Sequence, residues 1–186
     1  MAVKPWLGVI KNSVPSNYQP SKGDSQGPDA TLELEYVFGY RCHDTRNNLR
    51  YSSDGKLVYH TAGVGVVLDT KTNTQKFFRD HKSDILCLAI NPAGTICVTG
   101  EASSHLCVWD IATQTLIDKV SKPMKKGIRH VAFSPDGKLI AASDMTEDHV
   151  CTIFELLTKK DKNGKMLSQI ATGNGGKANV MSLGFN

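Results

Sequence analysis

The sequence lacks the features that would place it in a membrane or in a disulfide-stabilised secreted class. It has no run of about 18 apolar residues, the length that a membrane-spanning helix needs. Residues 1–6 carry no apolar stretch of signal-peptide type. The five cysteines are an odd number without close pairs, which suits a reducing compartment better than a disulfide framework.

Metal-ligand spacing is also missing. Cys87, Cys97 and Cys107 are ten residues apart, and each lies inside an apolar, strand-like run. Structural zinc usually takes cysteines in tighter pairs, so we expect these three to be core thiols. The six histidines are scattered. The sequence therefore predicts no metal site.

Motifs of catalysis and of cofactor binding are absent as well. Gly63-Val64-Gly65 lacks the third glycine of a dinucleotide-binding loop and no helix follows it, so a hairpin explains both glycines better. No nucleophile elbow surrounds a serine, and Ser103-Ser104-His105 has the character of a turn between strands. We expect no catalytic residue and no cofactor.

What the sequence does contain is a repeated hairpin. Gly55, Gly94 and Gly137 each stand in a short polar turn between apolar runs, 39 and then 43 residues apart. Glycine suits such turns because a tight hairpin often needs a positive φ. A second landmark, an acid that closes an apolar run, recurs 41 and then 45 residues apart, at Asp69, Asp110 and Glu155. Two landmarks with periods near 40 to 45 residues predict a β-propeller.

The repeat divides the chain into segments. Three four-stranded blades are expected, followed by one strand of a fourth. The expected segments are a linker over 1–31, an irregular segment over 32–48, blades over 49–81, 82–127 and 128–178, and an opening strand over 179–186. Because a propeller closes with about 4–8 blades, we expect the remaining blades to come from further sequence or from another chain.

The middle repeat resembles the WD40 repeat. The spacing between His81 and Trp109-Asp110 is that between the Gly-His and Trp-Asp pairs of the family. The resemblance implies that His81, Trp109 and Asp110 have structural roles within the blade. The third repeat lacks both and has Gly127 and Phe154-Glu155 instead. We therefore expect an all-β, WD40-type propeller fragment, part of a longer tandem propeller.

A narrower resemblance lies upstream. Leu34 to Arg41 and Thr45 to Leu49 are similar to the HELP motif of the echinoderm microtubule-associated protein-like (EMAP-like) family. The resemblance implies two joined propellers, with the HELP segment in the joint, and binding to tubulin and microtubules in the cytoplasmic cytoskeleton or the ciliary axoneme. The residues that it assigns to the joint are Tyr36, Phe38, Gly39, Tyr40, Arg41, Arg46, Asn47 and Asn48.

The aromatic residues of this segment alternate. Tyr36, Phe38 and Tyr40 are therefore expected on one face of a strand. They would form either an exposed binding strip or part of the packing between two propellers. We favour packing, because of the apolar area involved.

Two lysine clusters are candidates for partner binding. Lys122, Lys125 and Lys126 follow the fourth strand of a blade, whereas Lys159-Lys160-Asp161-Lys162 follow a third strand. In a meandering blade these turns lie on opposite faces. We favour the first cluster, because its loop is short and contains Pro123.

The net charge of +4 mildly favours acidic partners. The sequence thus predicts a non-enzymatic microtubule-binding scaffold. The alternative is a general WD40 hub for other proteins in a signalling or ciliary complex, without contact to tubulin. Neither interpretation involves nucleic acid or a membrane.

Overall fold

The computed structural model describes residues 5–19 and 30–186, with the side chains of residues 5–7 left aside. It divides into two compact units, residues 1–34 and residues 35–186. In the first unit, Pro5–Ser13 form helix α1. The sequence predicted no helix here, and the assignment of residues 1–31 as a linker between units stays a prediction. Proline suits the first turn of a helix, where its missing N–H would have no partner, and the Ser13 hydroxyl donates to the Val9 carbonyl at 2.8 Å. No described helix is long and apolar enough to span a membrane.

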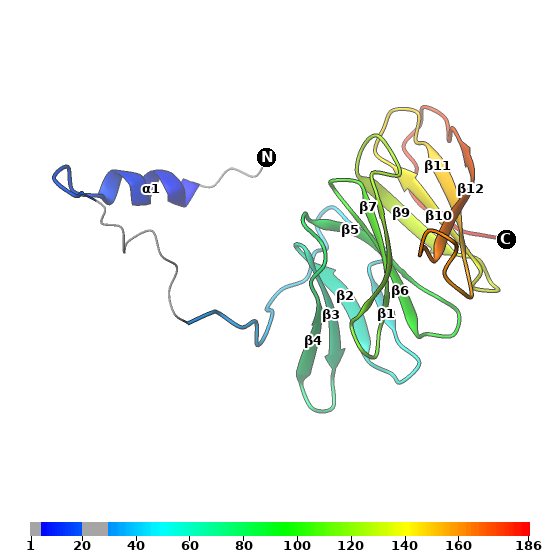
Figure 1. Ribbon diagram of the computed structural model, residues 1–186, viewed down its shortest axis with the longest axis horizontal. Coiled ribbons are helices and arrows are strands. Elements are labelled where there is room, and N and C mark those ends of the chain that lie inside the picture. Colours follow the sequence, from blue (N-terminus) through cyan, green and yellow to red (C-terminus); the bar gives the residue numbers. More distant parts are fainter. Residues whose placement is uncertain (1–4, 20–29) are drawn as a thin grey trace. The chain divides into compact units, whose positions relative to one another are not determined.

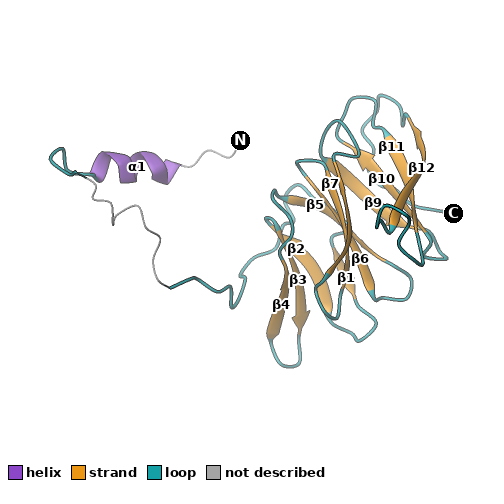
Figure 2. Ribbon diagram, viewed as in Figure 1, coloured by secondary structure: helices purple, strands orange, loops and turns teal. Residues whose placement is uncertain are grey.

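The second unit consists of three four-stranded antiparallel sheets, each connected in chain order (Figures 1 and 2). This confirms the predicted all-β, WD40-type propeller fragment. The first sheet contains β1 (Leu49–Tyr51), β2 (Leu57–Thr61), β3 (Val64–Asp69) and β4 (Thr74–Phe78). The second contains β5 (Ile85–Ile90), β6 (Ile96–Glu101), β7 (His105–Asp110) and β8 (Leu116–Ser121). The third contains β9 (Ile128–Phe133), β10 (Leu139–Asp144), β11 (Cys151–Leu156) and β12 (Leu167–Gly173).

The three repeated glycines form the turn that joins the first two strands of each sheet. Gly55, Gly94 and Gly137 have φ angles of 77°, 71° and 72°. Each N–H donates to the carbonyl three residues earlier, at 2.9 to 3.0 Å. All three turns thus have the positive φ that glycine in a tight hairpin predicted. Glycine suits these positions because it adopts such an angle without strain.

Gly94 also lies against a neighbouring blade. A Cβ atom there would meet the backbone N of Ser53 at 2.6 Å, whereas a Cβ at Gly55 would meet nothing within 4 Å. We expect Gly55→Ala to cost about 1 kcal/mol from φ strain alone, and Gly94→Ala about 2–3 kcal/mol because Ser53 must also move. Urea unfolding of both variants measures the difference. Equal losses would contradict the close approach.

The core lies between and within the sheets. One buried cluster joins the second and third sheets through Leu106, Ile128, Ile140 and Phe154. Another joins the first and second sheets around Phe78 and Trp109. Cys87, Cys97 and Cys107 are buried in these clusters as free thiols. Burial raises the pKa of Cys87 and Cys107 to about 12, which keeps these thiols protonated and inert.

The structure assigns no strand at residues 179–186, where an opening strand is expected. The described contact of this segment with β9 is made by a side chain: the Val180 carbonyl bonds to His130 Nε2 at 2.9 Å. A strand requires a backbone ladder, and the further strands of a fourth blade, which would supply it, are not among the described residues. The opening strand therefore stays a prediction.

Candidate functional site

A buried chain of polar side chains crosses the second sheet. His81 precedes β5, Thr99 lies on β6 and Trp109 on β7. Trp109 Nε1 donates to Thr99 Oγ1 at 3.2 Å, and Thr99 Oγ1 lies 2.6 Å from His81 Nε2. The other ring nitrogen, Nδ1, lies 2.6 Å from a carboxylate oxygen of Glu101, whose side chain is also fully buried. The network thus ties two strands, β6 and β7, to the segment that enters the blade.

The direction of each proton follows from these contacts. A carboxylate only accepts, so His81 Nδ1 donates to Glu101. Burial lowers the pKa of His81 more strongly than Glu101 raises it, so the ring is neutral. Its Nε2 then accepts from the Thr99 hydroxyl, which itself accepts from Trp109. Burial alone would raise the pKa of Glu101, but the bonds from Ser103 and His81 outweigh it and the pKa is lowered.

Sequence reasoning singled out His81 and Trp109 but missed Thr99 and Glu101. The available signal was the presence of two polar residues inside an otherwise apolar strand. Asp110, the third residue that the WD40 resemblance selected, lies outside the network. Its carboxylate accepts from the backbone N–H and the hydroxyl of Thr113, both at 2.8 Å, and so closes the turn after β7.

The third sheet has an apolar version of this arrangement. Gly94 and Gly137 are 43 residues apart, so equivalent positions of the second and third sheets differ by 43. By this count His81 corresponds to Met124, and Thr99 corresponds to Ala142. Phe154 pairs with Ile140 as Trp109 pairs with Cys97. Met124, Ala142 and Phe154 are all buried in one cluster. The third blade therefore packs by apolar contact where the second uses hydrogen bonds.

The HELP-like segment lies against the first sheet and is connected to the second. Gln75 on β4 holds it by accepting from the Val37 N–H at 2.7 Å and donating to the Val37 carbonyl at 3.1 Å. Arg41 forms ion pairs with Asp44 at 2.6 Å and with Asp84, just before β5, at 2.8 Å. Burial of these charges is incomplete, so their main effect is to orient the segment.

The remaining joint residues form contacts inside this segment. Asn48 is buried and bonds to the Tyr40 hydroxyl, the Arg41 carbonyl and Thr45. Arg46 donates to the carbonyls of Cys42 and Thr45 at 3.2 and 2.9 Å.

Two residues give the segment its backbone shape. Asn47 has a φ of 54° and Gly39 a φ of 119°. Both angles lie in the left-handed region, which few residues other than glycine and asparagine adopt. A joint with a second propeller stays a prediction.

The expected aromatic strip is different in the structure. Tyr36, Phe38 and Tyr40 belong to no strand, which corrects the prediction of a common strand face. Tyr40 packs edge-on against Tyr59 at 6.0 Å, while Tyr36 and Phe38 lie 4.8 Å apart, with Phe38 89% exposed. The segment crosses one face of one sheet, so only the side chains directed at that sheet are covered.

A buried histidine lies close to this segment. His60 on β2 is fully buried, and neither ring nitrogen has a hydrogen-bond partner. It stands 39 residues before Thr99, at the corresponding place in the first blade. Burial first, then the charges of Arg41 and His81, lower its pKa to about 4, opposed by Asp44.

This shift makes stability depend on pH. In the unfolded chain the histidine titrates near its ordinary pKa of about 6.5, so between about pH 6.5 and 4 the unfolded state binds the proton and the folded state does not. Above pH 6.5 we expect His60 to have little effect on the free energy of unfolding. As the pH drops to 4.5, protonation of His60 in the unfolded chain should lower this free energy by about 2–3 kcal/mol. Urea unfolding at pH 7 and pH 4.5 measures this loss.

The matched variants are His60→Thr and His43→Thr. The first should remove this part of the pH dependence, because the imidazole is gone. The cavity that it leaves should lower the free energy of unfolding equally at pH 7 and pH 4.5. The second alters an imidazole whose side chain is 77% exposed and should retain the pH dependence. An unchanged pH dependence in His60→Thr would contradict the assignment.

The first lysine cluster is displayed by a loop with a buried anchor. Met124, in the middle of the loop, is buried in the core. Buried Ser104 donates to the Met124 carbonyl at 2.8 Å, and its own carbonyl accepts from the Lys122 N–H at 2.7 Å. The side chains of Lys122, Lys125 and Lys126 are exposed. Their backbone is thus held while their ammonium groups face solvent, and no described carboxylate pairs with them.

The second lysine cluster lies at the opposite end of the blades. It belongs to the hairpin between β11 and β12, whereas the first loop contacts Ser104 in the turn between β6 and β7. Asp161 lies among its lysines and accepts from the N–H groups of Asn163 and Lys165, each at 2.8 Å. The hairpin therefore carries a carboxylate within its own positive patch, which the first loop does not.

Within the described residues, no group of three or more His, Cys, Asp or Glu side chains is placed to hold a metal ion. The buried polar network has its hydrogen bonds directed inward and joins strands to one another. The surface feature that the geometry singles out is the anchored lysine loop.

Comparison with known proteins agrees with the architecture. The HELP motif model matches residues 27–66, and the model of the WD domain, G-beta repeat, matches residues 72–110 and 117–155. The ciliary WD repeat-containing protein ctxp80 of Euplotoides octocarinatus is 38% identical over 189 residues, covering 88% of this chain and 26% of its own length.

Two relatives carry the name of the family itself. Echinoderm microtubule-associated protein-like 2 of Rattus norvegicus is 31% identical over 144 residues, with 70% of this chain and 22% of the relative covered. Echinoderm microtubule-associated protein-like 1 of Homo sapiens is 29% identical over 141 residues, covering 69% and 17%. The chain thus spans about a quarter or less of the length of these relatives. With a HELP motif followed by WD40 repeats on three four-stranded sheets, the chain belongs to the EMAP-like family.

Proposed function

We propose that this protein is a non-enzymatic scaffold that binds microtubules. The observation that carries the proposal is the anchored loop with Lys122, Lys125 and Lys126, which presents three exposed cations without a carboxylate in the loop. Tubulin has an acidic surface, so such a loop complements it in charge. The names of two relatives, which describe microtubule-associated proteins, support the same partner.

Binding through this loop involves no covalent reaction. The loop backbone is fixed by Ser104 and by burial of Met124, so little ordering entropy is lost when a partner docks. The three charges lie within five residues, and their fields add within one Debye length of about 8 Å at physiological salt. In the cell, the proposal places the protein on the cytoskeleton, and the ciliary name of one relative supports the axoneme as one location.

Co-sedimentation with microtubules assembled from purified tubulin tests the proposal. We expect the full-length protein to pellet with microtubules in the absence of any other protein. If it remains in the supernatant at every salt concentration, the proposal is wrong and the general-hub alternative is favoured. Pelleting without microtubules measures self-association and serves as the blank.

A further inference from the structure

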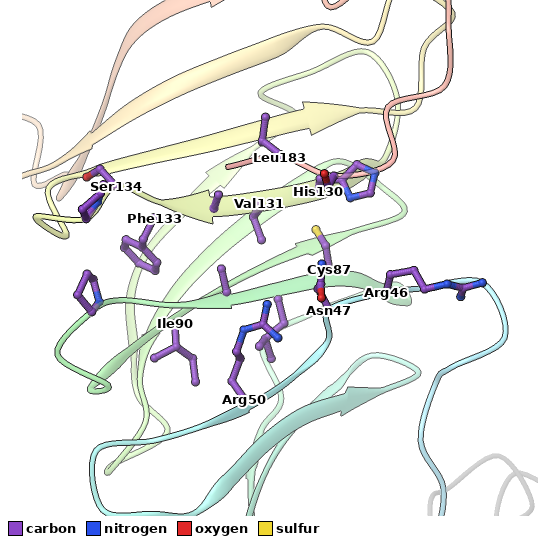
Figure 3. Close-up of a pocket in the computed structure, with 16 residues that line it drawn as sticks. Arg46, Asn47, Arg50, Cys87, Ile90, His130, Val131, Phe133, Ser134 and Leu183 are labelled. Carbon is purple, nitrogen blue, oxygen red and sulfur yellow. The ribbon is translucent and has the colours of Figure 1, made fainter. Parts of the chain in front are cut away.

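The first strands of the three blades enclose an open, arginine-lined groove. Two adjoining hollows of about 290 and 370 Å³ share Arg46 and His130 in their walls. Arg50 lines the first hollow and Arg129 the second. Figure 3 shows Arg50 reaching from β1 into the first hollow, with His130 and Leu183 on the opposite side.

The charges of the groove are unevenly balanced. Among the described residues, no carboxylate forms an ion pair with Arg46, Arg50 or Arg129. The carboxylate in these walls, Asp44, is already paired with Arg41 at 2.6 Å. The groove therefore carries net positive charge that no group of the described chain compensates.

Two of these arginines are held in place by neutral groups. Arg46 donates from Nη1 to two carbonyls, and Arg50 donates from Nη1 to the Leu49 carbonyl at 2.9 Å. A guanidinium has five N–H donors in a planar fork, so most of them stay available for a carboxylate. The arginines are preorganised without being neutralised, which is the arrangement expected of an anion-binding wall.

The shape of the groove favours an extended chain. β1, β5 and β9 each form one edge of their sheet, and an edge strand presents unpaired backbone N–H and C=O groups. Residues 180–183 of this chain contribute to the walls of both hollows, and the Val180 carbonyl is bound by His130. A peptide backbone can pair with such edges, whereas a nucleic acid backbone lacks the alternating N–H and C=O groups that this pairing needs.

We propose that this groove binds an extended acidic peptide segment, whose carboxylates are held by Arg46, Arg50 and Arg129. The site is formed by other residues than the lysine loop and goes beyond the proposed microtubule contact, although both expect an acidic partner.

Fluorescence anisotropy with labelled ten-residue peptides tests the proposal on the full-length protein. We expect a glutamate-rich peptide to bind and the same peptide with glutamine to bind at least about tenfold more weakly, because the carboxylates carry the recognition. Equal binding of the two peptides would overturn the proposal. So would binding of a single-stranded oligonucleotide of equal charge in place of the glutamate peptide.

The double variant Arg50→Gln/Arg129→Gln should weaken glutamate-peptide binding by about tenfold or more. Its matched control, Lys159→Gln/Lys160→Gln, removes the same charge from the hairpin between β11 and β12, which lines neither hollow, and should change binding less than about twofold. Should the first variant unfold, Arg50→Lys/Arg129→Lys keeps the charge but loses the fork, and intermediate affinity is expected. Unchanged affinity in a folded arginine variant would overturn the proposal.

The two proposals fail separately. If the arginine variants bind the peptide normally while the protein still pellets with microtubules, the groove assignment alone is wrong. If the peptide binds as expected but the protein does not pellet, the microtubule proposal alone is wrong.

Discussion

Replacing Trp109 with alanine is expected to cause the largest loss of stability of any single change in this chain, about 3–5 kcal/mol. The indole is fully buried and stacks on Phe78 with ring centroids 4.8 Å apart and planes 4° from parallel. A Cβ atom on Gly65 would lie 3.1 Å from it, so the ring also fills the space beside β3. Its removal therefore empties the contact between the first two blades. Urea unfolding measures the loss.

Two further variants separate the contributions of the ring. Trp109→Phe keeps most of the stacking but removes the N–H that donates to Thr99 at 3.2 Å, and about 1–2 kcal/mol should be lost. Tyr51→Ala alters an aromatic side chain that is 71% exposed and should cost less than about 0.5 kcal/mol. A loss of under about 1 kcal/mol for Trp109→Ala would contradict the packing described here.

Reversing the charge of the anchored loop is expected to have the largest effect on function. Lys122→Glu, Lys125→Glu and Lys126→Glu together change the local charge by six units, from +3 to −3. Repulsion from an acidic partner should weaken microtubule affinity by about a hundredfold or more. The side chains are exposed and pair with no described carboxylate, so the melting temperature should hardly change. Co-sedimentation measures the affinity, and thermal unfolding checks the fold.

The matched control reverses Lys159, Lys160 and Lys162 on the hairpin at the opposite end. It introduces the same change of charge, and we expect a much smaller loss of affinity. If the control abolishes binding and the loop variant does not, the partner docks on the other face of the blades.

The regular part of the fold was predictable because it depends on local chemistry. A glycine at each hairpin must have a positive φ, and the spacing of Gly55, Gly94 and Gly137 therefore marked three equivalent sheets. The buried thiols could be predicted for a similar reason, since Cys87, Cys97 and Cys107 lie in apolar runs.

The features that the sequence did not predict depend on distant contacts. Phe38 and Tyr40 alternate as in a strand, but their backbone has no ladder partner, and Gln75 holds the segment across a sheet instead. An alternating pattern describes one chain, whereas a strand needs two.

The candidate binding surfaces were likewise predictable only in part. The lysines of the loop are visible in the sequence, and Pro123 suggested that the loop is held. The stronger anchor is Ser104, eighteen residues before Lys122, whose hydroxyl and carbonyl bind the loop. The groove was not visible at all, because Arg50 and Arg129 line adjoining hollows only when β1 and β9 flank β5.

The most direct test of the central claim is the salt dependence of microtubule affinity, measured by co-sedimentation for the unmodified protein and for the loop variant. If the lysine loop contacts tubulin, the affinity of the unmodified protein falls steadily as salt rises, and the variant binds weakly with a much flatter dependence. A protein that binds microtubules equally well at all salt concentrations, or a variant that matches the unmodified protein throughout, would contradict the account.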